Sequence, residues 1–580
     1  MPLTQEQQDF LVAEGKIVLC AVPGSGKTYV VAQKMVKYLV DWSRRHQGIA
    51  ALSFTNVASE EIKKQIANSS LGLSEVGYPH FIGTLDSFIN NFIFLRFGYL
   101  MNPQKRERPT IVHDNYGELS FSPNESICYK KGCTTNPTKL HWSIDGLCKD
   151  GKLVDCEVSP KPCIKYKNAL YQKGIFTQRE VPTFALRILQ EFPQIAKAIA
   201  FRFPIIIVDE AQDTSREQME ILDCLSKAGV QTMILVGDPD QSIYEWRDAT
   251  PEYFLQKIGD PNWKTLHLSA NFRSSQLICN AAQYFSSMLC DKGPANAMGD
   301  SATYDQKPIL LRVSNGCTRD DIIAEFLKLC KEHNIALSSD KVAVLTRGKI
   351  HSGLPSDVWK SPETASLAMA SYEWYRHNRR DAYRICEKAL YSIVIGNAQK
   401  LTYEEIHENA VTLFSLSGWK SKVIALLQLL PSPAQPLRDW GDKAKAALTE
   451  LMNSGKISIC DNRTIRDIIK LKTRDTKHPD FLDRQVIDYF EKRASLEYTL
   501  SSVHGVKGET FDATLLIVDI TRGANALTPT ILNTGNLNSE LMRIAYVAMT
   551  RPRKLLVVSL PKSYNKLLRM PQSLWEYREI

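Results

Sequence analysis

The chain has 580 residues, of which 44% are hydrophobic, 23% charged and 9% aromatic, with a formal net charge of +9 at pH 7. This apolar share excludes a mainly disordered chain, and the length predicts about three to five domains. The N-terminus has no basic stretch followed by an apolar run, and no apolar run approaches the ~18 residues of a membrane span. The 13 cysteines are scattered, as in reduced thiols. We therefore expect a soluble cytoplasmic protein without a signal peptide.

Short apolar strands followed by helical patterns recur along the chain. Strands are predicted at 17–21, 49–54, 204–208, 232–236, 342–345, 513–518 and 555–558, and early helices at 29–40 and 56–67. Continuous β-branched runs are typical of strands that are buried on both faces. The sequence therefore predicts an α/β protein with two cores, each a parallel sheet covered by helices.

Two stretches interrupt this alternation and predict insertions. Residues 92–195 have a Gly-, Cys- and Lys-rich middle, and residues 352–494 have helical patterns at 365–375, 381–391 and 423–430. We predict that the first core comprises 1–91 and 196–268, that the second comprises 269–351 and 495–580, and that each carries a largely helical insertion.

Residues 21–28, with the sequence AVPGSGKT, follow a predicted strand and open a predicted helix. In this setting a Gly-rich turn directs backbone N–H groups and a helix N-terminus toward polyphosphate. The strict phosphate-loop pattern fails at its first glycine, so the alternative is a chance Gly-rich turn. The predicted phosphate-binding residues are Gly24, Ser25, Gly26, Lys27 and Thr28.

An apolar strand ends at Asp209 and Glu210. Asp209 is placed to hold Mg²⁺ together with the Thr28 hydroxyl, while Glu210 would orient and deprotonate the attacking water. The alternative is a carboxylate pair that only caps a helix. The two motifs together predict ATP and Mg²⁺ as cofactors.

Five segments resemble, in the same order, motifs of the UvrD/Rep/PcrA branch of the superfamily 1 helicases. They are residues 209–213 (DEAQD), 236–247 (VGDPDQSIYEWR), 271–274 (NFRS), 504–508 (HGVKG) and 545–551 (AYVAMTR). The resemblance implies two RecA-like P-loop cores with ATP between them, and 3′→5′ movement on single-stranded DNA.

The same resemblance implies further nucleotide contacts. Gln7 matches a glutamine that reads the adenine edge, and Phe272 matches an aromatic residue that stacks on adenine. Tyr29 follows the phosphate threonine, where many members carry an arginine near the base. Residues implied around the γ-phosphate and the attacking water are Gln241, Arg247, Arg273 and Arg551, the last two reaching across from the second core. The alternative for the arginines is an ordinary surface charge.

A single-strand track is implied by residues that match the DNA-binding positions of the family. Aromatic side chains there stack on successive bases whatever the sequence, although core packing is the alternative for the aromatic pair 244 and 246. Two departures matter: Asp86 would repel a DNA phosphate beside Thr84, and Thr510 stands where the family has an acid. The implied DNA-binding residues are Phe54, Thr55, Asn56, Thr84, Tyr244, Trp246, His504 and Lys507.

The first insertion contains a cysteine cluster with His141 in its midst. Its spacing differs from that of paired zinc knuckles, which favours reduced thiols over a metal site. The same stretch is rich in lysine, which indicates either a solvated face or a surface for duplex DNA or a partner. The cysteines are Cys128, Cys133, Cys148, Cys156 and Cys163.

These patterns predict an ATP-dependent DNA helicase or translocase. Residues 21–28 and 506–512 (VKGETFD) also resemble the GajB-type helicases of Gabija antiphage defence, which implies docking on an OLD-family ATPase-nuclease. Little chain follows Arg551, so we expect no fused C-terminal nuclease. Two alternatives stay open: a DNA-stimulated ATPase that senses ends or single strands and licenses a partner nuclease without unwinding, and an RNA-directed helicase.

Overall fold

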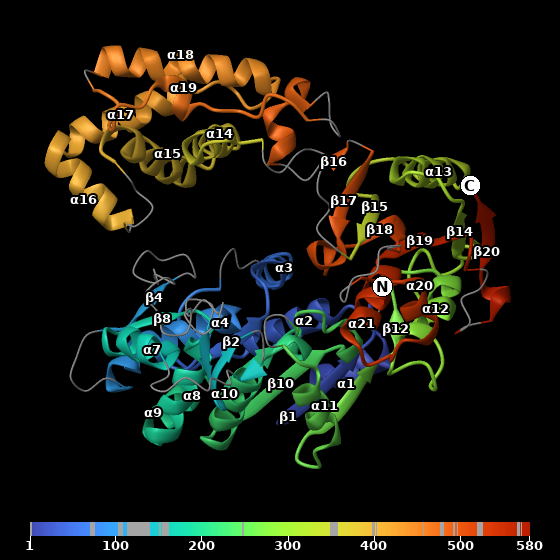
Figure 1. Cartoon of the computed structure of the whole chain (residues 1–580). Coiled ribbons are helices and arrows are strands. Elements are labelled where there is room, and N and C mark those ends of the chain that lie inside the picture. Colours follow the sequence, from blue (N-terminus) through green and yellow to red (C-terminus); the bar gives the residue numbers. More distant parts are fainter. Residues whose placement is uncertain are drawn as a thin grey trace. The chain divides into compact units, whose positions relative to one another are not determined.

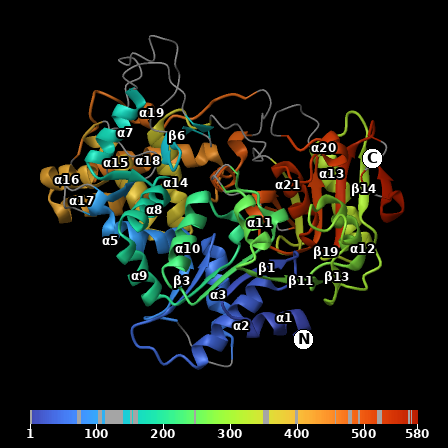
Figure 2. The same ribbon diagram turned by 90° about the horizontal axis from the view of Figure 1, so that it is seen from below.

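Figures 1 and 2 show the computed structural model of the chain. The described residues are 3–69, 76–101, 108–112, 140–149, 152–153, 162–245, 249–347, 358–396, 401, 403–455, 457–475, 481–490, 494–495, 497–518, 526–564, 569 and 571–580. They form two compact units, one that contains both large sheets and one that is made of helices.

The first core is a parallel sheet with the order β11-β1-β10-β9-β2-β3. Its strands are β1 (Lys16–Ala21), β2 (Ile49–Ser53), β3 (Phe81–Thr84), β9 (Ile205–Val208), β10 (Thr232–Gly237) and β11 (Lys264–Leu268). Because side chains alternate along a strand, Ile17 and Leu19 face one apolar core, whereas Val18 and Cys20 face another. Both faces of the sheet are therefore buried by helices.

Helices from distant parts of the chain cover the two faces of the first sheet (Figure 1). One face is covered by α1 (Gln5–Val12), α2 (Lys27–Val40) and α3 (Asn56–Ala67). The other is covered by α4 (Leu85–Ile89), α8 (Val181–Glu191), α9 (Pro193–Arg202), α10 (Arg216–Lys227) and α11 (Glu252–Gly259). Helix α8 falls inside the predicted insertion 92–195 but packs on this core, because its buried apolar face matches the sheet.

The second core is also a parallel sheet, whose order from β17 onward is β17-β15-β18-β19-β14-β20. Its strands are β14 (Ile309–Val313), β15 (Val342–Thr346), β17 (Tyr498–Ser502), β18 (Phe511–Ile517), β19 (Pro552–Pro561) and β20 (Glu576–Glu579), with the short β16 (Ala494–Ser495) before β17. Helix α13 (Arg319–Glu332) packs on one face, and α12 (Gln276–Ala282), α20 (Pro529–Thr534) and α21 (Glu540–Met549) pack on the other.

The helical unit has its own apolar core, which includes the fully buried Trp419 and Trp440. Its helices are α14 (Pro362–Tyr375), α15 (Arg379–Val394), α16 (Tyr403–Phe414), α17 (Leu416–Leu429), α18 (Leu437–Gly455) and α19 (Ile465–Ile468). Within the described ranges no single helix is long and apolar enough to cross a membrane; by length and composition only the bent pair α16–α17, angled at 108°, passes when taken together.

Smaller elements precede α8. They are α5 (Leu95–Phe97), β4 (Thr110–Val112), β5 (His141–Ser143), β6 (Gly146–Lys149), β7 (Lys152–Leu153), α7 (Pro162–Gln172) and β8 (Ile175–Thr177). Strands β5, β6 and β7 form an antiparallel sheet, and β4 pairs in parallel with β8. The predicted fold class, α/β with two helix-covered parallel sheets, is confirmed.

Candidate active site

The phosphate loop connects β1 to α2 at the carboxyl edge of the first sheet. Gly24 and Gly26 have φ angles of 75° and 79°, in the left-handed region that glycine adopts without steric cost. Gly26 is the N-cap of α2, so Lys27 and Thr28 are the first two residues of the helix. The loop therefore presents the positive end of the α2 dipole to a bound anion.

Lys27 carries a buried ammonium at the start of α2. Its Nζ makes no hydrogen bond with the described residues and lies 3.8 Å from Oε1 of Glu210. The buried hydroxyl of Ser25 also lacks a hydrogen-bond partner among the described residues. Because a buried ammonium without a hydrogen-bond acceptor is costly, this arrangement fits a site that is completed by phosphate oxygens.

Thr28 and Asp209 supply the oxygen ligands that suit Mg²⁺. Oγ1 of Thr28 donates to Oδ2 of Asp209 over 3.1 Å, and the backbone N–H of Asp209 donates to the Leu52 carbonyl over 2.8 Å. A hydroxyl and a carboxylate are hard donors of the kind that hold Mg²⁺ beside substrate phosphates. The residues present therefore fit the predicted cofactor.

Glu210 is held in a strained backbone conformation beside Lys27. Its φ is 56°, which is uncommon for a residue other than glycine and typical of functional sites. Burial opposes ionisation of Glu210, but the charges of Lys27 and Lys507 outweigh it and hold its pKa below the ordinary range. Burial and the neighbouring Glu210 raise the pKa of Asp209. Glu210 is thus the carboxylate that stays ionised.

Three buried polar residues connect Glu210 to the end of β10. Gln212 donates from Nε2 to Glu210 over 2.5 Å and accepts the Asp238 N–H at Oε1 over 3.1 Å. Gln241 donates to Oδ2 of Asp238 over 2.6 Å, and burial raises the pKa of Asp238 to about 6. Gln212 and Asp238 were not among the predicted site residues, although both lie inside the helicase-like segments.

Arg551, from the second core, reaches this network. Its guanidinium donates to Oε1 of Gln241 over 2.9 Å and to the Val547 carbonyl over 3.0 Å. The side chain is 1% exposed, and this burial lowers its pKa to about 10, so it is charged at neutral pH. The structure therefore brings Arg551 to the residues of the first core that surround Lys27.

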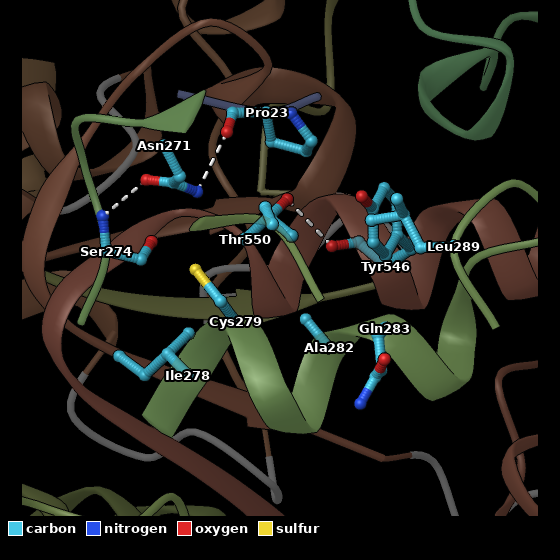
Figure 3. Close-up of a pocket in the computed structure, with 11 residues that line it drawn as sticks. Pro23, Asn271, Ser274, Ile278, Cys279, Ala282, Gln283, Leu289, Tyr546 and Thr550 are labelled. Carbon is cyan, nitrogen blue, oxygen red and sulfur yellow. Dashed lines mark hydrogen bonds between the residues drawn. The ribbon is translucent and has the colours of Figure 1, made fainter. Parts of the chain in front are cut away.

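The segment Asn271–Arg273 packs directly on the phosphate loop. The Phe272 N–H donates to the Gly24 carbonyl over 2.8 Å, and the Asn271 amide donates to the Pro23 carbonyl over 2.9 Å. Figure 3 shows Asn271 between Pro23 and Ser274, beside a cavity of only about 10 Å³. Arg273 donates to the Thr550 carbonyl over 2.9 Å.

The remaining predicted nucleotide contacts lie around the loop. Gln7 is buried, donates to the Ser25 carbonyl over 3.2 Å and accepts the Thr4 N–H over 3.1 Å. Tyr29 is 42% exposed on α2. Arg247 lies outside the described residues, as does Trp246 of the predicted DNA track. The structure therefore places Gln7 and Tyr29 beside the phosphate loop.

Three predicted DNA-track residues gather around the ring of a fourth, Tyr244. The Tyr244 ring lies 5.1 Å from the Phe54 ring and 5.9 Å from that of His504, and the Lys507 ammonium lies 4.9 Å from its centroid. Phe54 and Tyr244 are both partly exposed to solvent. The structure therefore brings these predicted track residues together from both cores.

His504 and Lys507 also contact the first core directly. Nε2 of His504 lies 2.8 Å from the Ile243 carbonyl, and Lys507 donates to the Gln241 carbonyl over 2.7 Å. Lys507 forms an ion pair with the buried Asp213 as well. In this structure the Lys507 ammonium is thus engaged between the cores.

Two polar residues of the predicted track serve as helix caps in this structure. Thr55 caps α3 and Thr84 caps α4 through their hydroxyl oxygens, whereas Asn56 is exposed. Asp86 accepts a hydrogen bond from Gln218 over 2.7 Å. The acid that was expected to repel DNA phosphate therefore has a partner within the first core.

The cysteine cluster lies mostly outside the described residues, which include neither Cys128, Cys133 nor Cys156, and only the backbone of Cys163. His141 and Cys148 are paired across β5 and β6. Among the described residues no group of three His, Cys, Asp or Glu side chains forms a metal site. Lys167, from the lysine-rich stretch, is buried against Glu180 at 2.6 Å and so does not belong to a solvated face.

The structure has two parallel sheets. One carries the phosphate loop, and an arginine from the other is hydrogen-bonded to the polar network beside that loop. This arrangement defines a two-core P-loop protein. The UvrD/REP helicase N-terminal domain matches residues 3–109 and 160–262, and the UvrD-like helicase C-terminal domain matches residues 444–563. The chain belongs to the UvrD-like helicases, which confirms the resemblance seen in the sequence.

Individual relatives match at modest identity. The Gabija protein GajB of Bacillus cereus (strain VD045) is 27% identical over 329 residues, covering 56% of this chain and 58% of GajB. The ATP-dependent DNA helicase Rep of Buchnera aphidicola is 29% identical over 287 residues (47% and 43%), and the ATP-dependent DNA helicase PcrA of Staphylococcus aureus (strain Mu50) is 24% identical over 289 residues (48% and 39%). The chain thus spans less than two thirds of the length of each of these relatives.

Proposed function

We propose that this protein is an ATP-dependent DNA helicase or translocase that moves 3′→5′ along single-stranded DNA. The observation that carries the proposal is the hydrogen bond from Arg551 to Gln241, which joins the second core to the network around Lys27 and Glu210. A site that needs both cores links hydrolysis to their relative movement. Membership of the UvrD-like helicases supports the same assignment.

Hydrolysis is assigned to named side chains. Lys27 pairs with the β- and γ-phosphates, and Glu210, kept ionised by Lys27 and Lys507, accepts a proton from the attacking water. Thr28 and Asp209 would hold Mg²⁺, which when bound would supply positive charge to neutralise the phosphates. Arg551 and Arg273 stabilise charge on the transferred phosphoryl group from the second core.

Movement of the two cores toward each other would also move the aromatic residues of the predicted DNA track. Tyr244 lies three residues after Gln241, and its ring packs against Phe54. A change at the phosphate end of this segment therefore shifts the ring that stacks on a base. Repeated closing and opening would advance the protein along one strand.

We further propose that the chain acts as the helicase subunit of an antiphage defence complex with an OLD-family ATPase-nuclease. The match to GajB, which covers 58% of that protein, supports this role. Co-expression with such a nuclease, followed by size-exclusion chromatography, tests it. Separate elution of the two proteins would remove the partner proposal and leave the helicase proposal standing.

Strand release from tailed duplexes tests the helicase activity. The full chain should unwind a duplex with a 3′ single-stranded DNA tail and leave one with a 5′ tail intact; a 3′ RNA tail addresses the RNA alternative. Glu210→Gln should abolish release, whereas Glu252→Gln, at an exposed position on α11, should not. DNA-stimulated hydrolysis without strand release would instead identify the DNA sensor.

A further inference from the structure

Helix α21 contacts the segment Gln241–Glu245 at two separate points. Just beyond its C-terminal end, Arg551 donates to Oε1 of Gln241 over 2.9 Å. Near its N-terminal end, Arg543 donates from Nε to the Ser242 carbonyl over 2.5 Å and from a terminal nitrogen to the Glu245 carboxylate. The two arginines are eight positions apart, Arg543 within α21 and Arg551 directly after its C-cap, Thr550.

Arg543 is directed into the first core and away from solvent. It is 4% exposed, and its remaining hydrogen bond goes to the Asn538 carbonyl just before α21. Ser242 is fully buried. A planar guanidinium serves a carbonyl and a carboxylate at once, which an ammonium on a flexible stem does less well. The contact is therefore specific for arginine at this position.

The two ends of the segment Gln241–Glu245 contact different parts of the candidate site. Gln241 is bonded to Asp238 in the network around Lys27, whereas Tyr244 packs on Phe54 in the predicted DNA track. Arg543 contacts the residue on either side of Ile243 and Tyr244, because it bonds Ser242 before them and Glu245 after them. It thus fixes the backbone that joins the phosphate end to the aromatic end.

We infer that Arg543 is a positioning residue that makes ATP hydrolysis responsive to DNA. By holding Ser242 and Glu245 against α21, it makes Tyr244 and Arg551 move together. Stacking of a base on Tyr244 then stabilises the arrangement in which Arg551 faces the γ-phosphate. This inference rests on the proposed function, since it assumes that DNA binds at Tyr244 and stimulates hydrolysis.

Glu245→Gln tests the inference without disturbing the fold. The Glu245 side chain is 48% exposed, and glutamine keeps its size while removing the charge that pairs with Arg543. DNA-independent ATP hydrolysis should be unchanged, while the stimulation by oligo-dT should fall about fivefold or more, within the usual range of coupling between sites. Glu252→Gln, which also neutralises an exposed glutamate of the first core, should keep full stimulation.

A double-mutant cycle separates coupling from general damage. Arg543→Lys should also lose stimulation, and Arg543→Lys/Glu245→Gln should lose no more than Arg543→Lys alone, because both changes break one contact. Thermal midpoints that match the wild type exclude a folding defect. If DNA stimulated hydrolysis by Glu245→Gln as strongly as by the wild type, or if the losses of the two single variants added fully in the double variant, the inference would be overturned and the proposed function would stand. If DNA did not stimulate ATP hydrolysis by the wild-type chain, both the inference and the proposed function would be overturned.

Discussion

Arg551 and Gln241 are joined across the two cores by a 2.9 Å hydrogen bond from the guanidinium to Oε1. The side-chain NH₂ of Gln241 donates to Asp238 over 2.6 Å, so the acceptor oxygen is held in a defined orientation. A preoriented contact of this kind lowers the entropic cost of assembling the site.

Replacing Arg551 by alanine should slow ATP hydrolysis about 10³-fold or more, because an arginine that stabilises the transferred phosphoryl group is worth that much. ATP affinity, measured by equilibrium titration, should change far less, since Lys27 and the phosphate loop remain. Arg553→Ala is the matched control: this neighbouring arginine is 53% exposed and pairs with Asp512 at 3.5 Å. Equal losses in the two variants would contradict the assignment.

Gly24→Ala should weaken ATP binding by about tenfold or more, the equivalent of ~1.4 kcal/mol. Gly24 has a φ of +75°, and an added Cβ would lie 2.8 Å from both Cβ of Arg273 and Oδ1 of Asn271. Gly316→Ala is the control, because its φ is +99° and nothing lies within 4 Å of its added Cβ.

Both glycine variants should lose about 1 kcal/mol of stability through backbone strain, as measured by thermal unfolding. Only Gly24→Ala should also lose nucleotide affinity and the packing of the loop on Asn271. If Gly24→Ala bound ATP like the wild type, nucleotide binding would not depend on the close packing of the phosphate loop against Asn271.

The strands that the sequence predicted are those buried on both faces. β9 (IIIV) and β10 (TMILVG) are fully buried, and their continuous apolar runs mark them. By contrast, β11 (KTLHL) and β20 (EYRE) are edge strands with exposed charged residues, so their composition resembles that of a loop. Edge strands are defined by their neighbours, which the local sequence does not contain.

The site divides in the same way. Local patterns place four site residues at one edge of the sheet, because they come after buried strands: Lys27, Thr28, Asp209 and Glu210. The contact of Arg543 with Glu245 joins residues almost 300 positions apart, and it exists only because α21 packs beside the segment after β10. No local pattern contains that packing, so Arg543 was not predicted.

Part of the free energy of unfolding of the protein without nucleotide should decrease as the pH rises from about 4 to about 6. Burial raises the pKa values of Asp213 and Asp238 to about 6 from 3.8. In this window the folded protein binds protons that the unfolded chain has released, so deprotonation favours unfolding. Each group contributes up to about 3 kcal/mol by the value of a pKa difference.

Thermal midpoints of the wild type and of Asp238→Asn, measured between pH 4.5 and pH 7, test this component. The amide does not titrate, so the difference in midpoint between the two proteins should shift in favour of Asp238→Asn as the pH rises. Carboxylates such as the partly exposed Asp260 and the exposed Asp467 have lowered pKa values and act in the opposite direction, but they are common to both proteins. A pH-independent difference would show that Asp238 is ionised throughout.

Tyr244→Ala should weaken binding of single-stranded DNA by about 1–3 kcal/mol, the value of one base stacked on an aromatic side chain. Tyr244→Phe keeps the ring beside Phe54 and should bind nearly as the wild type does. Fluorescence anisotropy with labelled oligo-dT measures this affinity, and titration of a fluorescent ATP analogue without DNA measures nucleotide binding, which should stay unchanged in both variants. If Tyr244→Ala lost nucleotide binding as well, the ring would be part of the core packing around Lys507 and Phe54, because truncation would then have released the network that holds Gln241.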